Sequence, residues 1–98
     1  MEIRFENKVA FITGAAGGIG YAAARMFAEA GASVVMVDWD GQITDRAKEL
    51  EAEGHNAIGI RCDVSDEAQV KAAVEKAVAV FGKLDIAYNN VGIHAAVR

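Results

Sequence analysis

The 98-residue sequence contains no proline, a single cysteine and no run of like charges. One cysteine cannot close an internal disulfide bond, and no Cys/His cluster with metal-ligand spacing accompanies it, so no metal site is predicted. Ten basic and fourteen acidic residues give a net charge of −4, which disfavours nucleic acid or an anionic membrane as a partner. No apolar run approaches the roughly 20 residues of a membrane span, and the N-terminus lacks a signal-peptide core. We therefore expect a soluble, cytoplasmic protein.

Apolar residues make up 53% of the chain and charged residues 24%, so a packed core within one domain is expected. Apolar runs predict four strands, over residues 9–12, 33–38, 57–63 and 84–89. The segments between them predict three helices, with Asp40 and Ser65 as N-caps of the second and third. The predicted helix stops are Gly31, Gly54 and Gly82.

This alternation of strands and helices predicts an α/β fold with a parallel sheet. Right-handed crossovers place the first two helices on one face if the sheet grows outward from the first strand. A fourth strand on the other side of the first gives the order 3-2-1-4 and puts the third helix on the opposite face. We therefore expect a doubly wound sheet.

A glycine-rich loop separates the first predicted strand from the first predicted helix. Its glycines are Gly14, Gly17, Gly18 and Gly20. The spacing that follows predicts one buried helix face, made of Ile19, Ala22, Ala23, Met26, Phe27 and Ala30. A helix that starts in such a loop offers main-chain N–H groups to a phosphate, and glycine allows close approach because it has no Cβ. The alternative is a tight turn that binds no ligand.

Asp38 ends the second predicted strand, 20 residues after Gly18. A carboxylate there can accept hydrogen bonds from both ribose hydroxyls of an adenosine, and it repels a 2′-phosphate, which favours NAD over NADP. Neither Gly17 nor Trp39 supplies a base that would neutralise such a phosphate. Trp39 is predicted either to flank the adenine or to pack half-buried. The alternative for Asp38 is a solvated acid or a helix cap.

The third and fourth predicted strands also end in polar residues. Asp63 and Val64 can supply an acceptor for an adenine amino group and an apolar contact for its ring, although Asp63 can equally be a helix-entry acid. Asn89 and Asn90 precede Val91 and Gly92, so this end either presents amides to a second ribose or forms an Asx-type turn.

Together these residues resemble the N-terminal half of a classical short-chain dehydrogenase/reductase. The resemblance rests on residues 13–20, Asp38, residues 63–64 and residues 89–92, and it covers essentially the whole chain. The single departure is Val91, where the family usually has alanine. The resemblance implies that residues 1–98 are the Rossmann-type, dinucleotide-binding portion of a single-domain dehydrogenase.

The family resemblance also implies an NAD(P)-dependent oxidoreductase that transfers hydride between nicotinamide and an alcohol or ketone carbon of a small molecule. Complete members are usually dimers or tetramers. By resemblance, the pyrophosphate and adenosine side is lined by Gly14, Ala16, Gly17 and Ile19. Gly18, Gly20 and Trp39 are further predicted cofactor-binding residues. Asp38 binds the ribose, Asp63 and Val64 bind the adenine, Asn90 and Gly92 approach the second ribose, and Asn89 braces the sheet.

The family's proton donor is a tyrosine followed four residues later by a lysine. Tyr21 is followed at that distance by Arg25 and Tyr88 by Gly92, so no catalytic residue is assigned within this chain. A fourth strand without a further neighbour leaves an open sheet edge, and the isolated chain is expected to be marginally stable or to self-associate.

Two other functions fit parts of the pattern. One is a non-catalytic module that senses NAD and signals through partners. The other is an S-adenosylmethionine-dependent methyltransferase, whose sheet also uses a glycine loop and an acid after the second strand. Its glycines usually lie closer together, and the Asn-Asn-x-Gly ending does not belong to it.

Overall fold

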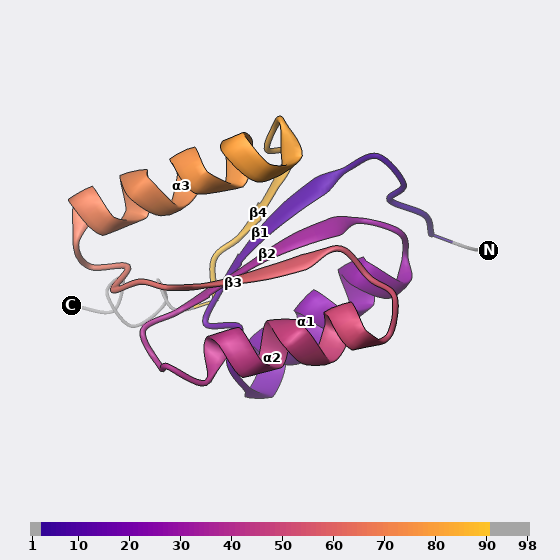
Figure 1. Ribbon diagram of the computed structural model, residues 1–98, viewed down its shortest axis with the longest axis horizontal. Coiled ribbons are helices and arrows are strands. Elements are labelled where there is room, and N and C mark those ends of the chain that lie inside the picture. Colours follow the sequence, from indigo (N-terminus) through magenta and orange to yellow (C-terminus); the bar gives the residue numbers. More distant parts are fainter. Residues whose placement is uncertain (1–2, 91–98) are drawn as a thin grey trace.

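Four parallel strands alternate with three helices along the chain in the computed structural model, which describes residues 3–90 (Figure 1). The elements are β1 (Val9–Thr13), α1 (Gly18–Glu29), β2 (Ser33–Asp38), α2 (Ile43–Ala52), β3 (Ala57–Arg61), α3 (Glu67–Phe81) and β4 (Ile86–Tyr88). The third and fourth strands are shorter than the predicted ranges 57–63 and 84–89, because their flanking residues form turns and connections instead.

The sheet has the order β3-β2-β1-β4, with every neighbouring pair parallel. Helices α1 and α2 cover one face and α3 covers the other (Figure 1). Both the predicted strand order and the predicted doubly wound, Rossmann-type arrangement are therefore confirmed. The order follows from right-handed crossovers on either side of β1, and it brings the β1–α1 loop to the point where the winding direction changes.

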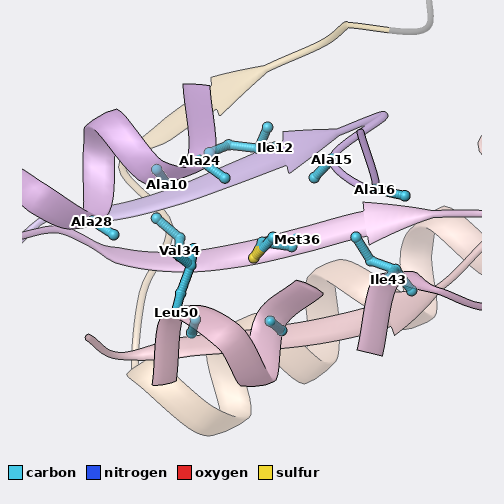
Figure 2. Packing of buried hydrophobic residues seen from close by; sticks show 12 residues of the cluster. Ala10, Ile12, Ala15, Ala16, Ala24, Ala28, Val34, Met36, Ile43 and Leu50 are labelled. Atoms are coloured by element: carbon cyan, nitrogen blue, oxygen red, sulfur yellow. The ribbon is translucent and has the colours of Figure 1, made fainter. Parts of the chain in front are cut away.

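The central strands β1 and β2 are buried on both faces, which explains why they are continuous apolar runs. Ile12, Met36 and Leu50 belong to the cluster on the side of α1 and α2, and Leu50 of α2 lies beside Val34 of β2 (Figure 2). Phe11 and Val35 belong to the cluster that α3 covers. Successive side chains of a strand point to opposite faces of the sheet, so each apolar run contributes residues to both clusters.

The predicted buried face of α1 is wrong in part. Ile19 and Met26 are 70% and 69% exposed, and the residues that α1 buries are Gly20, Ala23, Ala24 and Ala28. The small side chains face the sheet because they allow the helix to approach it closely. Ile19 and Met26 are left on the outer side of α1, whereas Phe27 is partly buried against the core cluster.

Two predicted helix caps also differ from the structure. Helix α2 begins after Gln42 rather than Asp40, because the Asp40 carboxylate accepts the Gln42 amide and forms a turn before the helix. Asp66, not Ser65, caps α3 by accepting the Ala68 amide. The three predicted glycine stops follow their helices with positive φ, as the left-handed C-terminal conformation requires.

The entry into β4 is tied to the start of β1 by Asp85. Its Oδ2 accepts the Val9 amide at 2.9 Å and lies 3.2 Å from the Lys83 ammonium. These contacts, led by the Val9 hydrogen bond, hold the pKa of the Asp85 carboxyl below its ordinary value. No helix within residues 3–90 is long and apolar enough to cross a membrane.

Candidate functional site

The candidate site lies where the β1–α1 loop meets the carboxyl ends of the other strands. Gly14 and Gly18 both have positive φ, at 65° and 59°, which a residue with a Cβ rarely adopts. Gly17 is the N-cap of α1 in an extended conformation, and no side chain of the described residues caps this helix end. The first N–H groups of α1 therefore lack intrahelical partners and face outward.

Two kinds of glycine can be distinguished in this loop by their surroundings. A Cβ on Gly20 would lie 1.9 Å from the Gly14 carbonyl oxygen and 3.1 Å from the Asn90 side-chain nitrogen, so Gly20 is required for packing. A Cβ on Gly17 or Gly18 would meet no atom within 4 Å. The space above these two residues is open to a ligand.

Asp38 turns its carboxylate toward the glycine loop. Oδ2 accepts the Ala16 amide at 3.0 Å, and Oδ1 accepts the Asp40 amide at 3.0 Å. The two main-chain donors lie on different oxygens, so the side chain is held in one orientation. Ala16 is buried, and its amide is already used by Asp38.

A hollow of about 190 Å³ lies beside this carboxylate, lined by Gly14, Asp38, Trp39, Cys62, Asp63 and Val64. A second hollow of about 290 Å³ is lined by Trp39, Arg61, Asp63 and Gln69. Trp39 and Asp63 line both. Trp39 is 70% exposed rather than half-buried, and its carbonyl accepts the Arg61 Nε–H at 2.8 Å.

Asp63 forms the turn at the entry to α3, as one of the two sequence interpretations expects, and its contact with an adenine stays a prediction. Its Oδ1 accepts both the amide and the hydroxyl of Ser65, at 2.9 and 2.7 Å, in the turn that precedes α3. These bonds hold the pKa of the Asp63 carboxyl below its usual value, and Oδ2 lies outside that turn. Burial raises the pKa of the neighbouring Cys62 thiol, which keeps it protonated and unreactive.

The ends of β1 and β4 are joined by a hydroxyl that the sequence analysis did not single out. Thr13 Oγ1 donates to Asn89 Oδ1 at 3.0 Å and accepts the Asn90 amide at 2.9 Å. Thr13 is buried, and this link places Asn90 beside Gly20. Gly92, the remaining predicted site residue, lies outside the described residues.

Arg46 is the other residue that sequence reasoning missed. It lies on α2, and its Nε donates to the Ala16 carbonyl at 3.0 Å. The predicted site residues Gly14, Asp38, Trp39, Asp63 and Val64 are thus brought together around one hollow, whereas Ile19 is exposed on α1. Among residues 3–90, no group of His, Cys, Asp or Glu side chains could hold a metal ion.

Comparison with known families decides the assignment. The model of the short chain dehydrogenase family matches residues 8–98. This chain belongs to that family. Membership agrees with the strand order and with the position of the glycine loop at the centre of the sheet. It supports neither the methyltransferase nor the NAD-sensing module.

Two relatives of this chain are named as dehydrogenases. It is 47% identical over 89 residues to cis-4-hydroxycyclohexanecarboxylate dehydrogenase of Sinomonas cyclohexanicum, covering 91% of the chain and 36% of the relative. It is 39% identical over 94 residues to meso-2,3-butanediol dehydrogenase of Serratia marcescens, covering 96% and 37%. The chain therefore spans little more than a third of the length of these relatives.

A solved structure shares both the fold and the sequence pattern. A short chain dehydrogenase/reductase from Burkholderia phymatum, crystallised in complex with NAD, superposes with a TM-score of 0.83 at 41% identity. The match covers 87% of this chain and 31% of that protein.

Proposed function

We propose that this chain binds NAD across the carboxyl edge of its sheet and forms the cofactor-binding part of an NAD-dependent oxidoreductase. The observation that carries the proposal is the Asp38 carboxylate, fixed by two main-chain amides at the rim of the hollow. The complete enzyme would transfer hydride between nicotinamide and an alcohol or ketone carbon of a small-molecule substrate.

Asp38 retains enough hydrogen-bonding capacity to hold a ribose. An ionised carboxylate offers about four acceptor positions, and the Ala16 and Asp40 amides use one on each oxygen. The remaining positions can accept the 2′- and 3′-hydroxyls of the adenosine. The same negative charge disfavours a 2′-phosphate, which supports NAD rather than NADP as the cofactor.

The diphosphate would lie on the N-terminal end of α1. Gly17 and Gly18 leave open space there, and an uncapped helix end attracts anions through its free amides and its dipole. Gly14, Gly20 and Ile19 shape the loop and the first turn, with Gly20 acting through packing. Ala16 would contribute as a contact rather than as a donor.

The adenine would occupy the hollow beside Asp38. Trp39 supplies an exposed aromatic face, Val64 an apolar contact, and Asp63 Oδ2 an acceptor for the amino group. On the other side of the loop, Asn90 and Gly92 would approach the second ribose. The bound nicotinamide would supply the hydride chemistry, and we assign no proton donor among the residues of this chain.

The complete protein would be a dimer or tetramer by resemblance to the family, and we expect it in the cytoplasm. Its substrate would carry the hydroxyl or ketone group that the names of its relatives imply.

Isothermal titration of the purified protein with NAD and with S-adenosylmethionine tests the proposal. Saturable NAD binding that ADP competes away, without comparable binding of S-adenosylmethionine, is the expected result. No NAD binding, or tighter binding of S-adenosylmethionine, would overturn it.

A further inference from the structure

We infer that Arg46 is a positioning residue for the phosphate-binding loop, because its hydrogen bond to the Ala16 carbonyl fixes the direction of the Gly17 N–H. The inference rests on the proposed function, because it concerns how the loop is prepared for a diphosphate. Arg46 lies on α2, 30 residues along the chain from Ala16.

The geometry of the peptide unit between Ala16 and Gly17 carries the first step. The Arg46 Nε–H donates to the Ala16 carbonyl at 3.0 Å, and the described residues contain no cis peptide bond. In a planar trans peptide the C=O and the following N–H point in opposite directions. With the carbonyl turned to α2, the Gly17 N–H is turned away from α2 and out of the packed side of the loop.

Ala16 is held from both sides. Asp38 accepts its N–H at 3.0 Å while Arg46 binds its C=O. Two consecutive peptide groups of the loop are thus fixed by side chains from β2 and α2. A loop that is fixed before binding loses less conformational entropy when the ligand binds. These contacts therefore increase the affinity for the ligand without contacting it.

The Arg46 guanidinium is itself fixed by its neighbours. Nη1 donates to Glu49 at 2.8 Å, and the guanidinium lies 5.6 Å from the centre of the Tyr21 ring. Tyr21 in turn donates its hydroxyl to Glu49 at 2.8 Å. A planar guanidinium can stack on the ring and donate from two different nitrogens at once, whereas a lysine ammonium cannot reproduce this arrangement of donors.

Arg25 provides a matched control on the neighbouring helix. Its guanidinium also lies 5.6 Å from the Tyr21 ring centre, and it forms an ion pair at 2.8 Å with Glu53, the residue that caps the C-terminal end of α2. It therefore carries the same charge and joins the same two helices. Its partners Tyr21, Glu29 and Glu53 lie outside the glycine loop. Removing Arg25 should therefore loosen the helix pair without releasing the Ala16 carbonyl.

The test compares ADP with adenosine, which share the base and ribose but differ in the diphosphate. Arg46→Met is expected to weaken ADP binding about tenfold, the effect of losing one hydrogen bond to a charged group, and to leave adenosine within about twofold. Arg25→Met is expected to change neither. Arg46→Lys should give a smaller loss in the same direction, and it replaces Arg46→Met if that variant does not fold.

The outcomes separate the inference from the proposed function. Wild-type protein that binds neither NAD nor ADP contradicts both. Wild-type binding with an unchanged ADP affinity in the Arg46 variant overturns only the inference. Equal losses for ADP and adenosine, or equal losses in the Arg25 and Arg46 variants, also overturn it, because they indicate a general loosening of the helix pair or a nonspecific charge effect.

Discussion

Replacing Asp38 with serine should reverse the cofactor preference of the protein. The carboxylate is held by the Ala16 and Asp40 amides and has capacity for both ribose hydroxyls of NAD. A hydrogen bond to a charged group contributes about 1.5–3 kcal/mol, so losing one weakens binding roughly tenfold or more. Asp38→Ser is expected to raise the Kd for NAD by about 10- to 100-fold.

The affinity for NADP should move in the opposite direction. Two unit charges 4 Å apart repel by about 1 kcal/mol in water and about 4 kcal/mol near a protein surface. Asp38 is half-buried, so removing its charge should improve NADP binding by about fivefold or more. The ratio of the two dissociation constants should therefore change by about 50-fold or more.

Quenching of Trp39 fluorescence provides the assay. Trp39 is the only tryptophan in the chain and lines both hollows. Asp40→Ser is the matched control, because Asp40 is an acid in the same turn whose carboxylate accepts the Gln42 amide instead. If NAD and NADP affinities fell together in Asp38→Ser, or if Asp40→Ser gave the same reversal, the ribose role of Asp38 would be refuted.

Three further predictions test the surrounding structure. Gly20→Ala should lower the free energy of unfolding by about 1–3 kcal/mol or more, since its Cβ would meet a main-chain oxygen at 1.9 Å; Gly17→Ala should leave denaturant stability unchanged and weaken NAD binding. The Val9 hydrogen bond lowers the pKa of Asp85, so the stabilisation from this carboxylate is fully present above the ordinary carboxyl pKa and is lost as the pH falls through the lowered pKa. As the pH falls below about 5, the stability of Asp85→Asn should therefore fall less steeply than that of wild type, and parallel curves would contradict this. Sedimentation should show concentration-dependent self-association of the isolated chain, because β4 lies at the edge of the described sheet; a monomer at all concentrations would argue against it.

The strands and their order were predictable because a strand that is buried on both faces requires a continuous run of apolar residues. Residues 33–38 form a continuous apolar run that ends in an acid, and β2 occupies that same range. The alternation of such runs with helical segments leaves few topologies once the crossovers are right-handed. The sheet order is therefore a consequence of the pattern and of chain chirality.

The packed face of α1 was not predictable from apolar spacing alone. Alanine occupies both sides of this helix, so hydrophobic periodicity could not distinguish the face that contacts the sheet from the face that bears Ile19 and Met26. The deciding factor is close approach: Gly20 lies against the Gly14 carbonyl. The predicted N-caps were wrong because several capping residue types lie near each helix start. Asp40 and Ser65 both lie there, but their side chains form hydrogen bonds within the turns that precede the helices.

In the candidate site, the residues that would face the cofactor could be proposed from sequence, whereas the residues that hold the loop could not. Asp38 is the last residue of β2, and Asp63 lies shortly after the end of β3, so their place at the sheet edge is set by the fold class. Arg46 and Thr13 act on partners 30 and 76 residues away, and no local spacing encodes those pairings. Asp38 belongs to both groups, because the carboxylate proposed to select the ribose also anchors the Ala16 amide. A change of cofactor preference at this position therefore also alters the loop that would hold the diphosphate, and Arg46 is the remaining side chain that still fixes Ala16 when Asp38 is replaced.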